Sequence, residues 1–170
     1  GNDDGLMLPP RISPAHAVII AITPKEDTRA GVLEAVERTA TSLRELRYGE
    51  NRVVVEVDTR DLGGGVKNWD WIKKGVPIRI EIGPRDVAKG TVAVSRRDRT
   101  HGHKAHLPIA ELVEQFLGML DGIQAGMLAR ATSFRDSHTK VIESKEEFYA
   151  FFTPRDANKP EIHGGFALAY

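Results

Sequence analysis

The sequence has 170 residues, 41% hydrophobic and 28% charged with a formal net charge of zero, which suits a packed globular chain and excludes a disordered one. It contains no cysteine, which excludes a disulfide framework, a thiolate zinc site and a cysteine nucleophile. No apolar run reaches the ~20 residues of a membrane-spanning helix, and residues 1–4 are acidic where a signal peptide is basic, so we expect a cytoplasmic protein with no membrane partner.

A strand, a helix and a second strand are predicted first. Residues 17–22 form a continuous apolar run between two prolines, which is typical of a strand covered on both faces. Between residues 32 and 46 apolar side chains recur at helical spacing, and Gly49 marks the end of the helix. Residues 52–57 are rich in valine and predict the second strand. A unit of this length joins parallel strands by a right-handed crossover, so the fold class is α/β.

Helices and strands continue to alternate along the chain. The pattern predicts a short helix over residues 66–74, a strand over residues 77–82 and another over residues 91–97. Residues 107–134 keep the helical period over a long stretch, so we expect a main helix packed on the sheet. A short helix over residues 144–152 and an apolar strand within residues 163–170 complete the prediction.

Charge is unevenly distributed along this neutral chain. Between Arg60 and Lys104 there are eleven basic residues and five acidic ones, a surplus of six that the rest of the chain offsets. A basic segment on a neutral protein is typical of a domain that meets a phosphate backbone on one face. A solvated, lysine-rich surface gives the same count and stays open as the alternative.

The strand near residue 80 alternates strictly between apolar and charged residues. Its three isoleucines point to one face, whereas Arg79 and Glu81 point to the other. One interpretation is a surface ion pair. The other is a recognition surface, in which Arg79 offers paired donors and a carboxylate such as Asp86 accepts the N1 and N2 protons of an unstacked guanine.

Other features of the sequence carry weaker chemical signals. Residues 63–65, three glycines, match neither the dinucleotide nor the Walker spacing, which favours a flexible turn over a phosphate loop. His101, His103 and His106 have no obvious carboxylate to complete a metal site, which favours a solvated cluster. Because Trp69 and Trp71 point to different faces, we expect Trp71 in the core. No nucleophile elbow or triad is evident, so no catalytic residue is assigned.

The segment Lys-Gly-Val-Pro-Ile-Arg-Ile-Glu-Ile-Gly-Pro-Arg-Asp, residues 74–86, resembles the signature of anticodon-binding domains in prolyl-tRNA synthetases of the archaeal and eukaryotic type. Residues 3–10 resemble the stretch that leaves the catalytic domain of these class II enzymes. Residues 92–104 resemble the following strand with its basic loop, and residues 164–168 the start of a C-terminal zinc-binding-like region. The resemblance therefore spans essentially the whole chain.

The resemblance implies a three-layer domain with a mixed five-stranded sheet flanked by helices. It implies a linker over residues 1–13, the anticodon-binding domain over residues 14–136 and the truncated start of the C-terminal region over residues 137–170. The implied partner is the anticodon loop of proline tRNA, whose second and third bases are guanines, and not DNA. The implied parent is a homodimeric proline ligase that uses ATP and magnesium in its catalytic domain, so this chain needs no cofactor and no metal of its own.

Carried over residue by residue, the resemblance places anticodon contacts at three motif positions, Arg79, Arg85 and Asp86. It adds further tRNA-binding positions at Lys67, Glu81 and Lys104. In the family's motif Gly-Trp-Lys-Phe-x-x-Trp-Glu, which falls on residues 65–72, the base-contacting Glu is replaced by Ile72. Whether Asp70 takes its place is left open.

Three alternatives to this interpretation remain. The first is a free-standing module of the same fold that binds another protein or RNA. The second is the equivalent domain of a threonyl-, histidyl- or glycyl-tRNA synthetase. The third is a small α/β enzyme that binds phosphate through residues 63–65.

Overall fold

The structure, a computed structural model, describes residues 5–99, 102–154, 156, 158 and 165–169. The chain divides into two compact units, Gly1–Gly126 and Met127–Tyr170, and the division falls inside the helix α4 (Ile109–Ser137). Among the described residues, no helix is both long and apolar enough to cross a membrane.

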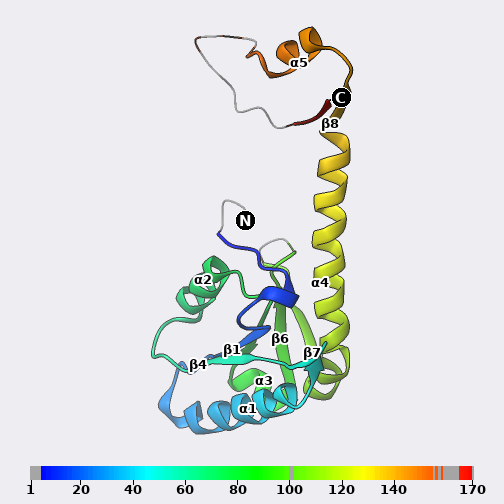
Figure 1. Cartoon of the computed structure of the whole chain (residues 1–170). Coiled ribbons are helices and arrows are strands. Elements are labelled where there is room, and N and C mark those ends of the chain that lie inside the picture. The colour runs from blue at the N-terminus through cyan, green and yellow to red at the C-terminus, as the bar shows by residue number, and fades with distance from the viewer. Residues whose placement is uncertain (1–4, 100–101, 155, 157, 159–164, 170) are drawn as a thin grey trace. The chain divides into compact units, whose positions relative to one another are not determined.

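A mixed five-stranded sheet forms the centre of the first unit (Figure 1). Its strands, in spatial order, are β4 (Val55–Asp58), β1 (Ala17–Ala21), β5 (Ile78–Ile82), β6 (Thr91–Arg96) and β7 (Ala105–Pro108). Strand β1 pairs in parallel with β4 and β5, whereas β6 is antiparallel to both β5 and β7. The predicted α/β class and mixed five-stranded sheet are confirmed.

Helices cover both faces of this sheet. Helices α1 (Glu26–Arg44) and α3 (Pro84–Lys89) lie on one side of it and α2 (Gly64–Lys74) on the other (Figure 1). The buried side of α1 carries the apolar residues that predicted it, Val32, Val36, Ala40 and Leu43. The helix begins earlier than its apolar pattern because its first turn contains the acidic residues Glu26 and Asp27, which the helix dipole favours at that end.

The alternation of β5 separates a core face from a polar face. Ile78, Ile80 and Ile82 are fully buried, and Ile80 pairs with the buried Val94 of β6. On the opposite face, Trp71 of α2 packs against the buried cluster formed by Val18, Ile20 and Val76. Trp71 is therefore part of the core, as predicted.

The sequence pattern missed several short elements. Helix α3 has six residues, fewer than two helical turns, so no periodicity marks it. Edge strand β7 has four residues and ends in Pro108, a residue that weakens strand signals. A two-stranded hairpin of β2 (Arg47–Tyr48) and β3 (Asn51–Arg52) follows α1, where the prediction had the helix end at Gly49 and the second strand begin at residue 52.

The second unit joins the end of α4 to a small α/β arrangement. Strand β8 (Thr139–Ile142) pairs in parallel with β9 (Phe166–Ala169), and α5 (Lys145–Phe152) lies between them in sequence. The hydroxyl of Ser144 accepts a hydrogen bond from the backbone N–H of Glu147 at 3.1 Å, which caps the start of α5. The predicted helix and terminal strand are confirmed, whereas β8 was not predicted.

Candidate nucleic-acid interface

A pocket of about 730 Å³ lies where β5 ends and α3 begins, and we call it the β5 pocket. It brings together four of the six predicted contact residues, Glu81, Arg85, Asp86 and Lys104. The other lining residues are Ile22, Pro24, Lys25, Thr28, Gly83, Pro84, Ala93 and His106. The sheet thus gathers residues that lie more than twenty positions apart, because β7 returns the chain to the edge of β6.

The turn from β5 into α3 holds a carboxylate at this pocket. Pro84 occupies the first helical position, where its missing N–H costs nothing. Asp86, two residues later, accepts a hydrogen bond from the backbone N–H of Gly83 to its Oδ2 at 2.9 Å. Its other oxygen, Oδ1, lies 3.9 Å from Nδ1 of His106. The sequence Gly-Pro-Arg-Asp therefore fixes the orientation of the Asp86 side chain, which a hydrogen-bond acceptor for a base requires.

Glu81 does not pair with Arg79. Its Oε1 instead lies 2.6 Å from Nζ of Lys104. The interpretation of Arg79 and Glu81 as a surface ion pair is therefore wrong. Lys104 is brought beside Glu81 by the pairing of β7 with β6. Arg85 is exposed at the same pocket, and no carboxylate among the described residues forms an ion pair with it. Arg85 and the exposed Lys25, which also lines the pocket, therefore carry its unpaired positive charge.

Arg79 is buried rather than exposed, with 6% of its surface accessible. Its Nε donates to Oδ1 of Asn68 on α2 at 3.3 Å, but its Nη1 has no hydrogen-bond partner among the described residues. Burial and the nearby Arg97 lower the pKa of Arg79 to about 10, so it stays charged at neutral pH. A buried cation with an unused donor is costly unless an acceptor satisfies it, and a contact between Arg79 and the anticodon stays a prediction.

The polar face around Arg79 is bordered by the N-terminal segment of the described chain. Leu6 donates its N–H to the carbonyl of Lys73 at 3.2 Å, which places it beside the end of α2. Arg97, 4% exposed, donates from Nε to the carbonyl of Leu6 at 2.9 Å. Gly75 has a φ of +77°, and a Cβ there would lie 2.7 Å from Cβ of Leu6, so only glycine fits at this crossing. The predictions did not include Arg97.

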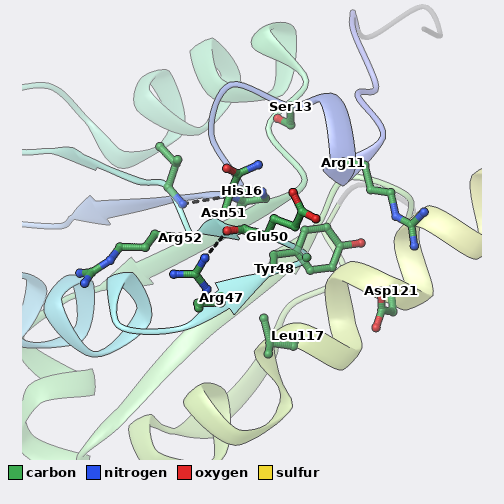
Figure 2. Close-up of a pocket in the computed structure, with 12 residues that line it drawn as sticks. Arg11, Ser13, His16, Arg47, Tyr48, Glu50, Asn51, Arg52, Leu117 and Asp121 are labelled. Carbon is green, nitrogen blue, oxygen red and sulfur yellow. Dashed lines mark hydrogen bonds between the residues drawn. The ribbon is translucent and has the colours of Figure 1, made fainter.

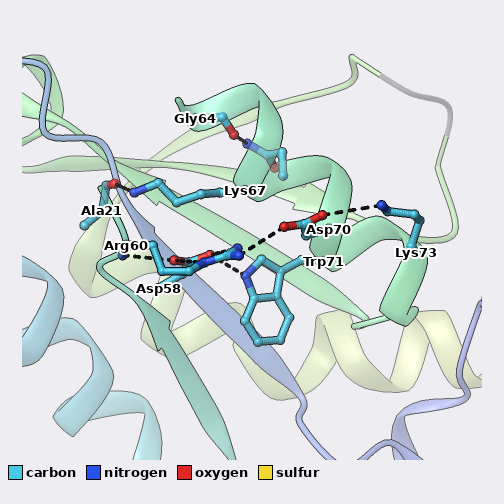
Figure 3. Close-up of polar contacts among 9 residues, drawn as sticks. Ala21, Asp58, Arg60, Gly64, Lys67, Asp70, Trp71 and Lys73 are labelled. Carbon is cyan, nitrogen blue, oxygen red and sulfur yellow. Dashed lines mark hydrogen bonds and ion pairs between the residues drawn. The ribbon is translucent and has the colours of Figure 1, made fainter. Parts of the chain in front are cut away.

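Lys67 lies on the buried side of α2 and does not line the β5 pocket. It is 1% exposed, and its Nζ donates to the carbonyl of Ala21 at the end of β1 at 2.7 Å (Figure 3). Burial lowers the pKa of Lys67, whereas the nearby Asp58 raises it. In this arrangement the ammonium ties α2 to the sheet, and a tRNA contact by Lys67 stays a prediction.

A buried carboxylate connects β4 with α2 (Figure 3). Asp58 accepts hydrogen bonds to Oδ2 from Nε1 of Trp71 at 2.8 Å and from Nη2 of Arg60 at 2.7 Å. Burial by itself would raise the pKa of Asp58, but the hydrogen bonds from Arg60 and Trp71 lower it to about 2. The network holds α2 in place over the polar face of the sheet.

Ile72 replaces the glutamate of the family motif, and no acidic residue of α2 lines the β5 pocket. Ile72 is 5% exposed and belongs to the core. Asp70 is occupied on both oxygens, with Nη1 of Arg60 at 3.1 Å and Nζ of Lys73 at 3.4 Å (Figure 3). Asp70 therefore acts within the network of α2.

The glycine and histidine features do not build further sites. Gly64 and Gly65 form the first turn of α2 rather than a flexible turn, and a Cβ at Gly64 would lie 2.7 Å from Cδ1 of Ile22. His103 and His106 line different pockets, and His101 lies outside the described residues. No group of three or more His, Asp or Glu that could hold a metal is found in the described part of the chain. His106 is the pocket residue that the predictions missed, and predicting β7 would have found it.

Comparisons with known proteins identify the family of this fold. Residues 16–119 match the family described as anticodon binding domain. The chain is 46% identical over 170 residues to a proline–tRNA ligase of Protochlamydia amoebophila, covering 99% of the chain and 34% of that protein. It is 45% identical over 174 residues to proline–tRNA ligase 2 of Anaeromyxobacter dehalogenans, covering 100% of the chain and again 34% of that protein.

A solved structure shares the fold. The prolyl-tRNA synthetase of Cryptosporidium parvum, complexed with L-proline and AMP, superposes with a TM-score of 0.76 at 28% sequence identity, over 88% of this chain and 31% of that one. The chain spans about a third of the length of the curated relatives, which carry 34% of their residues in the match. The sheet, its flanking helices and the matched residues 16–119 show that the chain belongs to the anticodon-binding domain family.

Proposed function

We propose that this chain recognises the anticodon loop of proline tRNA as the RNA-binding part of a proline–tRNA ligase. The observation that carries the proposal is the β5 pocket, where the oriented carboxylate of Asp86 lies beside the exposed guanidinium of Arg85. The similarity to proline–tRNA ligases along the whole chain supports the choice of tRNA.

The pocket chemistry suits an unstacked guanine. The N1–H and N2–H groups of guanine are adjacent donors, and a fixed carboxylate accepts both. Asp86 offers Oδ1 on the side away from its hydrogen bond with Gly83. Arg85 supplies an exposed cation for a phosphate oxygen, and the unused Nη1 of Arg79 supplies a donor on the same sheet face.

The bond-forming activity belongs to the parent protein in this proposal. The relatives are named as proline–tRNA ligases. We propose that the parent joins proline to tRNA with ATP and magnesium in a catalytic domain of its own. The chain contributes recognition and no cofactor, within a cytoplasmic homodimer. DNA is not proposed as a partner, because an unstacked guanine is presented by a single-stranded RNA loop.

Asp86→Asn tests this function. Asparagine keeps one carbonyl oxygen for the N–H of Gly83 but replaces the second acceptor with an NH₂ group that opposes the donors of guanine. We expect the variant to lose about 1 to 2 kcal/mol of discrimination at one anticodon guanine. The measurement is fluorescence anisotropy with the anticodon stem-loop of proline tRNA and with versions in which each guanine is changed.

The control for this experiment is Asp61→Asn, an exposed position outside the β5 pocket with the same change of charge. Its discrimination is expected to equal that of the unmodified chain. Equal affinity of the unmodified chain for all the stem-loops would refute the proposal. Preference for the stem-loop of a threonine, histidine or glycine tRNA would favour the related synthetases instead.

A further inference from the structure

A second pocket of about 740 Å³ lies between the β2–β3 hairpin, the 3₁₀ helix η1 (Pro10–Ile12) and α4 (Figure 2). We call it the hairpin pocket. Its residues His16 and Val54 precede β1 and β4, whereas the β5 pocket follows the last residues of β1 and β5. Because these strands are parallel, the two pockets lie at opposite ends of the sheet.

Three arginines line the hairpin pocket and lack acidic partners. Arg11 comes from η1, Arg47 from β2 and Arg52 from β3 (Figure 2). All three are exposed, and none forms an ion pair with a carboxylate of the described residues. Arg47 donates from Nη2 to the backbone carbonyl of Glu50, not to its carboxylate. No direct ion pair within the described chain therefore offsets their charge, although Glu50 and Asp121 line the same pocket.

Two of these arginines face each other across the hairpin. Arg47 and Arg52 are directly paired positions in the two antiparallel strands, and Gly49, with a φ of +63°, opens the turn between them. Like charges in directly opposite positions destabilise a strand pair. An anion held between the two guanidinium groups would reverse this repulsion.

The floor of the pocket supplies two neutral donors. His16, 7% exposed, accepts the N–H of Val54 at Nδ1 at 2.9 Å, so its ring proton lies on Nε2. Burial lowers the pKa of His16, which keeps the ring neutral at physiological pH. The hydroxyl of Tyr48 is buried and forms no well-aligned hydrogen bond with a described residue. Burial, together with the charge and hydrogen bonding of Asp121, raises the pKa of Tyr48, whereas Arg11 lowers it, so the hydroxyl keeps its proton and lies near both residues.

We propose that the hairpin pocket binds the phosphate of a ribonucleotide. The guanidinium groups of Arg47 and Arg52 hold the phosphate oxygens, with Arg11 across the pocket. Glu50 and Asp121, which also line the pocket, accept hydrogen bonds from donors such as ribose hydroxyls, which inorganic phosphate lacks. The nucleotide is either free or part of an RNA chain. This site does not depend on anticodon recognition, since it shares no residue with the β5 pocket.

Arg52→Gln tests the site, with Arg38→Gln as the matched control. Arg38 lies on α1, has 64% of its side chain exposed and lines neither pocket, so both variants lose one exposed positive charge. The probes are AMP, followed by amide chemical shifts at residues 47–52, and the anticodon stem-loop of proline tRNA, each at ionic strength matched with sodium chloride. Removal of a repelling charge leaves the hairpin folded, so Arg52→Gln is expected to unfold at the same temperature as the unmodified chain or above it.

The two probes separate the two sources of phosphate. For a free nucleotide, Arg52→Gln weakens AMP binding at least fivefold and leaves the affinity for the stem-loop unchanged. For an RNA phosphate, it lowers the slope of log affinity against log salt by about one unit while guanine discrimination is kept. Either result supports the site. Equal behaviour of Arg52→Gln and Arg38→Gln with both probes overturns it, and because Asp86→Asn is scored by guanine discrimination, the two proposals fail independently.

Tyr48→Phe provides a second variant with almost no change in shape. It removes only the buried hydroxyl, which lies near Asp121 and Arg11. We expect threefold to fivefold weaker binding of the probe that Arg52→Gln affects, with unchanged thermal stability. Unchanged binding of both probes would show that the hydroxyl takes no part in binding. It would contradict the placement of the phosphate at the pocket floor.

Discussion

Asp58→Ala is expected to lower the free energy of unfolding of the first unit by about 2 to 3 kcal/mol at pH 7. A hydrogen bond to a charged group contributes energy of this order. The variant removes the acceptor of Nε1 of Trp71 and of the Arg60 guanidinium. Arg60 is nearly half exposed and regains water, whereas the indole N–H stays partly buried. Urea unfolding followed by tryptophan fluorescence measures the loss.

The same carboxylate makes stability depend on pH in a defined window. The pKa of Asp58 is lowered from 3.8 to about 2 in the folded state. The stabilisation is therefore complete above the unfolded pKa and is lost as the pH falls from about 4 toward 2. Asp58→Ala should lack this part of the acid transition. Asp70→Asn, which removes a charge from the exposed side of the same network, is the control and should cost below about 1 kcal/mol; an equal loss in both variants would contradict a special role for the buried carboxylate.

Arg79→Met is expected to weaken binding of the proline anticodon stem-loop by about 2 to 3 kcal/mol. This is the energy of the charge-assisted hydrogen bond that we propose Arg79 donates to the RNA. The same variant should keep or raise the stability of the chain. The stability is kept because Nη1 of Arg79 is buried and has no partner among the described residues. Burial and the nearby Arg97 also disfavour the charge of Arg79 and lower its pKa. Replacing a poorly satisfied buried charge with an apolar side chain is often neutral or stabilising.

The comparison for this prediction is Arg97→Met, on the same sheet face. The guanidinium of Arg97 donates to the carbonyl of Leu6, so its removal should lower the free energy of unfolding by about 1 kcal/mol. Anisotropy with the stem-loop and urea unfolding are measured on both variants. A loss of stability in Arg79→Met with RNA affinity unchanged would show that Arg79 serves the fold and not the ligand.

Most of the helices and strands were predicted from hydrophobic periodicity and from the glycine and proline residues that end each element. The run over residues 17–22, the alternation around Ile80 and the long helical pattern after residue 107 all correspond to observed elements. The short elements α3 and β7 were not predicted, because four to six residues are too few to show a periodic pattern. They are stabilised by contacts with parts of the chain that are distant in sequence.

The candidate site was only partly accessible to the same reasoning. Arg85 and Asp86 follow a strand end, and the structure places both at the β5 pocket. Lys67 has the residue type of a phosphate contact, but the structure buries it on the sheet-facing side of α2, where it donates to the carbonyl of Ala21. A lysine in a sequence reveals its charge, whereas its solvent exposure depends on which helix face meets the sheet.

The sequence by itself determined the α/β class, the polar face of β5 and, through a long motif, the likeness to anticodon-binding domains. Only the tertiary structure decided that Lys104 pairs with Glu81, that Arg79 is buried with an unused donor and that Arg47 opposes Arg52. The reason is physical. Local patterns report which side of a strand or helix is apolar, but ion pairs, burial and pockets arise where strands distant in sequence become neighbours.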